Sequence, residues 1–503
     1  MEYSLDNEDQ DLNYYLGLKE SLPKTYVLRN KKIENRLDFY YYNPKFQALE
    51  KLLLKIKTHR TLSDLEMSNL IIPTSRNIVP ADSPDSLFSY ISISNVDVKD
   101  DIGTIVDYDT FRGDQAPSRA RQLIKEGDFI ISTVRPTRGA VFLATKSHNN
   151  FVCSTGFAIL RIDKSLNSNY IAEIFRSDYV IDQIERMQAG TEYPAINKKS
   201  DLRKIILMIP DKSKQDSIVD RIEKIKLKRA KLLYDARRLE ENTKNEFLET
   251  RNSLFDSILA KNNHSDNLKD KIYVVKRVAL RDRIDHEWYR PRHYNVENRL
   301  LNTKSVKKIK EIRKKIRYGV SISADYFTSG IQFLRIENIS NENLNLDDIK
   351  FISEDMENKV KSSYLEEGDI LISRSGTIGI AIVIPKSIGR LSFGSYILRL
   401  TLKDKNEVNP IYVSEFINSY FGRIQIERNT TGSNQLNITI PALESMLIPI
   451  PRKEIQNEIA QEIIKAREKL KTENEQVRVM RLEAEKILRD ERRNIIFWQQ
   501  VTN

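Results

Sequence analysis

The chain carries the heptapeptide Glu126-Gly127-Asp128-Phe129-Ile130-Ile131-Ser132 and repeats its pattern as Glu367-Gly368-Asp369-Ile370-Leu371-Ile372-Ser373. In both copies a Gly-Asp pair, typical of a turn, precedes an apolar run of the kind that forms a buried strand. The two copies are offset by 241 residues (367 − 126). This offset is far longer than the ~20–50-residue units of solenoid proteins, so the pattern indicates a duplicated domain.

Two further elements recur in the same order at nearly the same offset. The first, with the pattern Arg-x-Asp-x-x-aromatic-Tyr-x-Pro, occupies 36–44 and 283–291. The second, a Gln-Ile-Glu-Arg tetrapeptide followed by Gly-Thr or Gly-Ser, occupies 183–191 and 425–433. Three matches in one order cannot plausibly arise by chance. We interpret the Arg-x-Asp element as structural, with docking to a partner subunit as the alternative.

Composition indicates a globular protein with neither a membrane span nor an export signal. Of 503 residues, 40% are hydrophobic, which suffices for sizeable cores. No apolar run approaches the ~18–20 residues of a transmembrane helix, and the acidic start lacks the profile of a signal peptide. The single cysteine, Cys153, excludes an intramolecular disulfide, and we expect it to be a small core residue. We therefore predict a cytoplasmic protein.

Charge favours a nucleic-acid partner. The formal net charge is +11, and the run 304–317 holds eight Lys or Arg residues against one Glu. As a helix, this run would carry cations on most faces, which suits a phosphate backbone. The alternative is an ordinary solvated helix surface.

The order of the predicted elements indicates an α/β (α+β) fold: two duplicated domains joined and spaced by two long antiparallel coiled-coil helices. In each copy, β-like runs follow the opening element, a helical stretch comes next, and a strand ending in proline closes the domain. Among the strands, 154–161 matches 392–399. After each proline, apolar residues recur at three-, four- or seven-residue steps on a charged helix, the first of which would span ~70 Å. The predicted parts are an N-terminal extension at 1–29, a first domain at 30–212, a central helix at 213–265, a second domain at 266–451 and a C-terminal helix at 452–503.

Together these residues resemble the specificity subunit of type I restriction–modification enzymes. The resemblance rests on the paired elements above, on Arg374-Ser375-Gly376-Thr377-Ile378-Gly379 after the second buried strand, and on the loop at 432–438. It also includes the closing Ile-Pro-x-Lys-x-x-Gln-x-x-Ile stretches at 209–218 and 450–459, and it covers essentially the whole chain after residue 30.

The resemblance implies two target recognition domains, each reading one half of a bipartite, asymmetric site in double-stranded DNA. It implies that the helices set the spacing and bind two methylation subunits, that the larger assembly adds motor-nuclease restriction subunits, and that no membrane is involved. The chain itself would be a non-catalytic subunit without a cofactor, because the methyl donor and ATP belong to the partner subunits.

Candidate DNA contacts lie on loops beside the predicted strands, where a rigid scaffold presents polar tips. Arginine suits guanine, glutamine or asparagine suits adenine, and lysine binds phosphates. Where the second repeat has Arg374 to Gly379, the first has Thr133-Val134-Arg135-Pro136-Thr137-Arg138-Gly139, so we expect the two halves to read different sequences. Ser92 stands where Arg335 does on an otherwise matching strand, which suggests a base reader. The candidates are Ser92, Asn95, Arg135, Thr137, Arg138 and Tyr193 in the first repeat, and Lys314, Arg335, Asn338, Arg374, Ser375, Thr377, Asn434 and Gln435 in the second; a surface or structural role is the alternative for each.

The sequence shows few signs of an enzyme. It has no phosphate-binding loop or dinucleotide-binding turn, and its five histidines lack metal-ligand spacing. Asn409-Pro410-Ile411-Tyr412 approaches the Asn-Pro-Pro-Tyr signature of adenine methyltransferases, but the second proline is missing and we interpret it as a helix start. Its counterpart, Ser168-Asn169-Tyr170-Ile171, has no proline. The rival hypotheses are a self-contained methyltransferase or nuclease of the type II-like class, and a scaffold that binds protein and not DNA.

Overall fold

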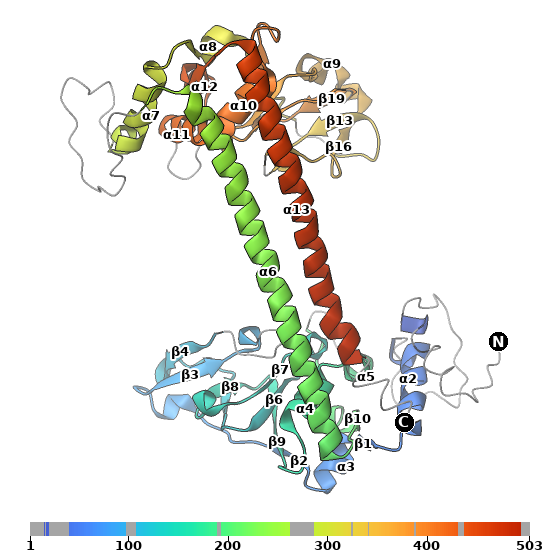
Figure 1. Ribbon diagram of the computed structural model, residues 1–503. Coiled ribbons are helices and arrows are strands. Elements are labelled where there is room, and N and C mark those ends of the chain that lie inside the picture. The colour runs from blue at the N-terminus through green and yellow to red at the C-terminus, as the bar shows by residue number, and fades with distance from the viewer. Residues whose placement is uncertain are drawn as a thin grey trace, which may run out of the picture. The chain divides into compact units, whose positions relative to one another are not determined.

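The computed structural model divides the chain into two compact units (Figure 1). The first comprises Met1–Asp235 and Met480–Asn503, and the second comprises Ala236–Val479. Each unit therefore combines one repeat with parts of both long helices. The structure describes residues 15, 17–19, 40–96, 107–188, 193–261, 286–322, 325–340, 342–386, 389–430 and 437–493.

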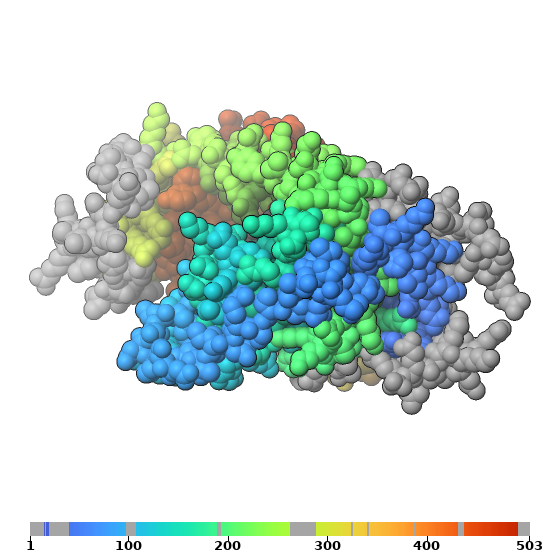
Figure 2. Space-filling view, turned by 90° about the horizontal axis from the view of Figure 1, so that it is seen from below, coloured from blue at the N-terminus to red at the C-terminus, as the bar shows by residue number. Residues whose placement is uncertain are grey.

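In its described part, the first unit is built on two four-stranded sheets. One has the order β2-β9-β6-β7 and is antiparallel throughout; the other has the order β4-β3-β8-β5, in which β3 and β8 run parallel. Figure 2, the space-filling view from below, shows atoms of this unit, in blue and teal, gathered on the face turned to the viewer. The elements are β1 (His59–Thr61), β2 (Ile71–Thr74), β3 (Leu87–Ile91), β4 (Asp109–Arg112), β5 (Ala120–Leu123), β6 (Asp128–Ser132), β7 (Val141–Leu143), β8 (Val152–Ser154), β9 (Phe157–Ile162), β10 (Ile206–Met208), α2 (Pro44–Lys55), α3 (Leu62–Met67), α4 (Ser168–Phe175) and α5 (Asp178–Met187).

The second unit repeats this plan. Its main sheet has the order β12-β20-β17-β18, a smaller sheet has the order β16-β13-β19, and β13 and β19 again run parallel. The strands are β11 (Val306–Lys308), β12 (Arg313–Tyr318), β13 (Ile331–Leu334), β14 (Ile339–Ser340), β15 (Asn343–Leu344), β16 (Lys350–Ile352), β17 (Ile370–Ser373), β18 (Ala381–Val383), β19 (Leu391–Phe393), β20 (Ile397–Leu402) and β21 (Leu447–Pro449). The helices are α7 (Pro291–Leu301), α8 (Ile309–Ile312), α9 (Glu357–Val360), α10 (Pro410–Asn418), α11 (Tyr420–Asn429) and α12 (Ile440–Ser445).

The duplicated Glu-Gly-Asp motif forms the same turn in both units. Gly127 (φ +81°) and Gly368 (φ +79°) adopt the left-handed conformation that glycine alone enters without strain. The aspartate that follows, Asp128 or Asp369, is buried and accepts a hydrogen bond from the backbone N–H three residues earlier, at 2.8 and 2.9 Å. The turn therefore leads directly into the central strand, β6 or β17. Because both units contain this turn and the same mixed sheets, the prediction of two duplicated helix-and-sheet domains is confirmed.

One strand match was out of register. In the first unit Ser132 pairs with Phe157, and in the second Ser373 pairs with Ile397. Phe157 therefore corresponds to Ile397, whereas matching 154–161 with 392–399 would equate it with the residue two positions earlier. Side chains in a strand repeat their facing every two residues, so a two-residue slip leaves the apolar pattern unchanged.

The Gln-Ile-Glu-Arg tetrapeptide holds the closing strand of each repeat. Gln183 donates its amide to the carbonyl of Ile206 at 3.0 Å and accepts the N–H of the same residue at 2.8 Å. Gln425 makes the same pair of bonds with Leu447, at 3.0 and 2.8 Å. Because a side-chain amide has one acceptor and two donors, it substitutes for a neighbouring strand at these positions.

The tetrapeptide also binds the Arg-x-Asp-x-x-aromatic-Tyr-x-Pro element. The guanidinium of Arg186 lies 4.6 Å from the ring centroid of Tyr41, and that of Arg428 lies 4.4 Å from Trp288. Both arginines also donate to the backbone carbonyl of their aromatic partner. These contacts give the aromatic position of the element, Tyr41 or Trp288, a structural role, as predicted. The Arg and Asp of the element lie outside the described residues.

Two long helices follow the repeats: α6 (Lys212–Ile258) and α13 (Lys453–Arg493) (Figure 1). In the second unit Lys469 pairs with Glu246 at 2.5 Å, and Thr243 bonds to Glu473. Residue numbers rise along one helix as they fall along the other, so the helices are antiparallel. Part of the predicted apolar stripes is buried, namely Ile218, Ile222, Ala236, Ile459, Ile463, Val477 and Ala484. The other predicted stripe residues are half-buried.

The prediction that the basic run 304–317 forms a helix is wrong. Most of the run lies in strands β11 and β12, which pair with β21 and β20, and only the four-residue helix α8 separates them. Pairing with strands that are distant in sequence outweighs local helix propensity here.

Candidate nucleic-acid interface

The loop after β17 carries the second repeat's main candidates. Its base is closed by Ser373, whose carbonyl accepts from Gly379 N–H at 2.7 Å and whose hydroxyl donates to the Thr377 carbonyl at 2.5 Å. Gly376 (φ +68°) and Gly379 (φ +76°) make the reversals that this closure needs. A short, tightly held loop therefore presents its polar tip beside the sheet.

Arg374 of this loop lies against an aromatic ring. Its guanidinium is 4.8 Å from the ring centroid of Tyr318, at the end of β12, and donates to the Ser395 carbonyl at 3.4 Å. Thr377 is exposed, whereas Ser375 is only 5% exposed, so Thr377 is the more accessible of these two candidates. The stacked ring restrains the guanidinium plane, which favours recognition by a fixed fork of donors.

The loop after β6 has a different tip with a similar pairing. Arg135 (φ +48°) has a left-handed backbone and donates its N–H to the Pro194 carbonyl at 2.6 Å. Its guanidinium lies 4.9 Å from the ring centroid of Tyr193, which is 68% exposed. The structure thus brings together two predicted residues far apart in sequence. Thr137 is half-buried and Arg138 is exposed on the same loop.

The candidates Ser92, Asn95, Arg335 and Asn338 lie on equivalent turns just after β3 and β13. In each turn the asparagine side chain accepts the backbone N–H of the residue three positions earlier, at 2.7 and 2.9 Å. Asn338 is 2% exposed and also donates to the Asn345 carbonyl at 3.0 Å. Its amide is therefore committed within the protein, which disfavours the prediction that Asn338 contacts a base.

Arg335 keeps a reachable guanidinium. It pairs with Asp348 at 2.9 Å and lies 5.5 Å from the ring centroid of Tyr326. Its counterpart Ser92 is half-buried and hydrogen-bonded to its own turn. The two repeats thus share the turn and differ at the side chain that it carries.

The basic run forms a cationic edge strand. Lys314, Lys315 and Arg317 lie on β12, at the edge of the main sheet of the second unit. Partial desolvation, with the nearby cations Arg317 and Arg399, lowers the pKa of Lys315. The equivalent edge strand of the first unit, β2, reads Ile-Ile-Pro-Thr and carries no charge. At this edge of the main sheet, the cations therefore belong to the second repeat and not to the first.

Sequence reasoning missed the aromatic residues around the second loop. Tyr318 and Tyr396 are 40% and 54% exposed, and the carbonyl of Tyr396 accepts the N–H of Arg374 at 2.9 Å. An aromatic residue at the end of a basic run was the available signal. The remaining candidates, Asn434 and Gln435, lie outside the described residues.

The resemblance of Asn409-Pro410-Ile411-Tyr412 to a methyltransferase signature reflects a helix cap. Asn409 precedes α10, and its side-chain oxygen accepts the N–H groups of Ile411 and Tyr412 at 2.8 and 3.3 Å. Asn167 caps α4 in the same way. The true counterpart therefore begins at Asn167, one residue before the stretch that we matched.

Among the residues that the structure describes, no group of His, Cys, Asp and Glu could hold a metal ion, and no helix is both long and apolar enough to cross a membrane. Cys153 is buried in the core as expected, and burial raises the pKa of its thiol to about 12.

Taken together, the geometry defines a class of protein in which one domain fold is used twice with different loops after the same central strand. The family described as type I restriction modification DNA specificity domain matches residues 106–271 and 302–483, more than half of the chain. The chain therefore belongs to this family and contains its domain twice.

Individual relatives are distant. The specificity subunit of the type I restriction enzyme EcoBI from Escherichia coli is 21% identical over 198 residues, which span 39% of each chain. A solved structure described by complex assembly and conformational transition of the type I R-M system is 19% identical and has a TM-score of 0.62, covering 88% of this chain and 98% of that one. The HsdS subunit from Thermoanaerobacter tengcongensis is 19% identical with a TM-score of 0.45, covering 86% and 97%. At these identities, the structural likeness of the first solved structure shows the fold alone.

Proposed function

We propose that this chain is the DNA sequence-specificity subunit of a type I restriction–modification complex, in which each repeat reads one half of a bipartite, asymmetric site. The observation that carries the proposal is that the two repeats share one fold but differ in the loop that follows the central strand. The first repeat presents Arg135 beside Tyr193, and the second presents Arg374 beside Tyr318, both after the same central strand. Two different sequence blocks require this combination of a common scaffold and distinct readers.

The two kinds of contact are divided between loop and strand. A guanidinium fork reads guanine O6 and N7 in the major groove, and we assign this role to Arg135 and Arg374. The cations of β12, Lys314 among them, hold phosphates and fix the register of the protein on the duplex.

The same proposal assigns the partner subunits of this chain and the location of the methyl donor and ATP. The chain is non-catalytic and cytoplasmic, α6 and α13 set the spacing of the half-sites and bind two methylation subunits, and restriction subunits complete the assembly. The methyl donor and ATP are held by these partners. Support comes from family membership and from the two long helices, which present many charged side chains outside their buried apolar stripes.

The test is selection by the full-length chain from a pool of duplexes with randomised sequence. We expect enrichment of two short sequence blocks separated by an unspecified spacer of fixed length. Salt-dependent binding without any enrichment would contradict sequence reading. Methyl transfer from a labelled donor by the homogeneous chain would contradict the non-catalytic assignment and favour the rival hypothesis of a self-contained enzyme.

A further inference from the structure

Arg423 of α11 holds the end of the loop that carries Arg374. Its Nη1 donates to the carbonyl of Ile378 at 2.6 Å. The next residue, Gly379, packs so closely on α11 that an added Cβ would lie 3.2 Å from Arg423 Nη1 and 2.5 Å from Ile426 Cδ1. The loop therefore returns to the sheet directly over α11, and the guanidinium binds the carbonyl of its penultimate residue, Ile378.

This anchor differs in origin from the other bonds that close the loop. Ser373 supplies those bonds from within the same segment, to Thr377, Gly379 and Ile380. Arg423 reaches the loop from a helix that follows it in the sequence by more than forty residues. Its guanidinium therefore adds to the bonds that hold the loop against the rest of the second unit, among them the bond from Arg374 N–H to the Tyr396 carbonyl at 2.9 Å.

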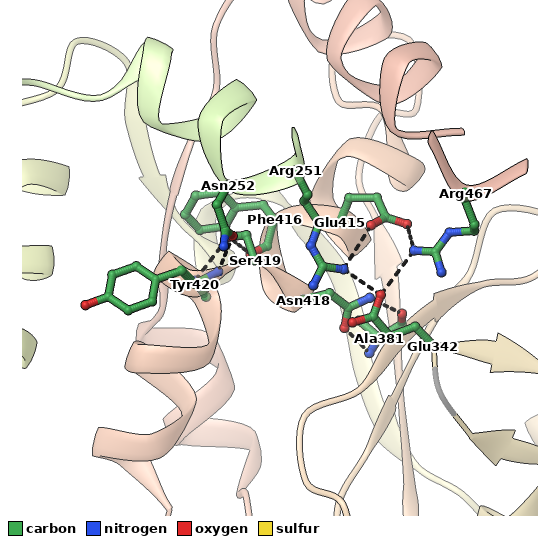
Figure 3. A network of polar contacts seen from close by, with 11 residues as sticks. Arg251, Asn252, Glu342, Ala381, Glu415, Phe416, Asn418, Ser419, Tyr420 and Arg467 are labelled. Atoms are coloured by element: carbon green, nitrogen blue, oxygen red, sulfur yellow. Dashed lines mark hydrogen bonds and ion pairs between the residues drawn. The ribbon is translucent and has the colours of Figure 1, made fainter. Parts of the chain in front are cut away.

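A partly buried charge network joins the two long helices to the domain of the second unit (Figure 3). Arg251 of α6 and Arg467 of α13 share the carboxylates of Glu342 and Glu415, at 2.5 to 3.5 Å. Burial lowers the pKa of Arg423, while the charge of Glu342 acts in the opposite direction and that of Arg251 in the same one. The charges of Glu342 and Arg251 therefore act on the guanidinium that binds the loop at Ile378.

In the first repeat, an uncharged residue packs against the equivalent glycine of the loop. Ile181 takes the place of Arg423, and its Cδ1 would lie 3.8 Å from a Cβ added at Gly139, the counterpart of Gly379. An apolar residue suffices to pack against the glycine in that repeat. Packing against the glycine therefore does not by itself require the guanidinium group of Arg423 in the second repeat.

We propose that Arg423 is a positioning residue for DNA recognition, which holds loop 374–379 and the Arg374 that it carries in the conformation that reads the second half-site. This inference rests on the proposed function of that loop. The test compares full-length Arg423→Met and Arg423→Lys with Arg374→Ala and with Ile181→Met, the matched change in the first repeat. Each variant is selected on randomised duplexes and titrated with selected and random duplexes, and its melting temperature is recorded.

We expect Arg423→Met to lower the ratio of selected to random affinity by on the order of tenfold, at the second half-site only. Arg423→Lys, which keeps one donor and the charge, restores part of the ratio, and Ile181→Met leaves both half-sites unchanged. A merely structural role would instead lower the melting temperature and weaken binding to all duplexes alike.

The outcomes separate this inference from the proposed function. If Arg374→Ala relaxes the second half-site while folded Arg423→Met does not, the positioning role is wrong and the reader loop stands. If Arg374→Ala itself leaves the ratio unchanged, the loop does not read DNA and both fall. Should Arg423→Met fail to fold, Arg423→Gln takes its place with the same expected result.

Discussion

The charge network of the second unit allows a stability prediction that can be worked from its geometry. Glu415→Gln removes a carboxylate that lies 2.5 Å from Nη2 of Arg467 and 3.5 Å from Nη1 of Arg251. Only Glu342 then remains to face two guanidiniums. The side chain of Arg251 is 3% exposed, so water cannot replace the lost partner.

Removing one partner of a buried ion pair costs about 3–5 kcal/mol, because the other charge stays buried without compensation. For a unit of this size each kcal/mol corresponds to roughly 2–4 °C, so we expect the melting temperature of the second unit to fall by about 10 °C. The matched control is Glu462→Gln, the same change in a pair with Lys465 whose side chains are 54% and 68% exposed. Exposed pairs contribute little, and we expect no measurable loss there.

Thermal unfolding followed by tryptophan fluorescence measures the difference in melting temperature, and denaturant unfolding measures the difference in free energy. Trp288 belongs to the second unit and lies on Arg428, so in a Trp498→Phe background the signal reports unfolding of that unit. If Glu415→Gln costs no more than Glu462→Gln, the network does not stabilise the second unit, and the reasoning from burial is refuted.

The remaining predictions address recognition, spacing and the buried thiol. Arg374→Ala should cost ~1–3 kcal/mol of discrimination at one half-site, whereas Lys314→Ala should weaken all duplexes and reduce the salt slope by about one charge; equal losses on specific and random DNA for Arg374→Ala would make it a backbone contact. Seven residues inserted after Leu239, matched by seven near Val477 on α13, add ~10 Å of helix and should lengthen the unspecified spacer by about three base pairs; an unchanged spacer in an active variant would show that the helices do not set it. Burial raises the Cys153 pKa from 9.0 to about 12, so its contribution to stability is present below pH 9 and is lost as the pH rises toward 12. Denaturant unfolding between pH 8 and 11 should therefore show a steeper decline for the natural chain than for Cys153→Ala, and parallel declines would contradict it.

The duplication, the mixed fold and the long helices could be predicted because their signals are local. Turn glycines, period-two strands and helical stripes are all visible within a few residues. The structure departed from prediction where residues distant in the sequence determine the secondary structure or the burial of a residue. The run 304–317 forms strands because β20 and β21 pair with it. Asn338 is buried because it lies inside a turn that the local sequence did not indicate.

The candidate site could be predicted only in part, for the same reason. Arg135 and Tyr193 were both predicted, but their contact across almost sixty residues depends on the fold. Tyr318 and Arg423 act on the second loop from other elements, so the loop sequence contains no trace of them. Comparing the repeats position by position would have pointed to Arg423, because Ile181 stands in its place, as it pointed to Arg335 through Ser92.

The two repeats also show which differences carry meaning. Asp128 is neutralised by Arg76 and Arg161, the latter at 2.7 Å, whereas Asp369 accepts from Thr401 at 2.7 Å and has Arg399 at 3.7 Å.

In the paired strands Arg161 corresponds to Thr401 and not to Arg399, so each repeat compensates the same buried charge from different positions. Sequence change at such positions preserves the buried aspartate and the turn that it closes. At the loop tips Arg135 and Arg374 each lie against an aromatic ring, and the residues around them differ between the repeats. Such divergence on a shared frame is the pattern expected where each repeat meets a different DNA sequence, and in the second repeat it extends inward from Arg374 to Arg423.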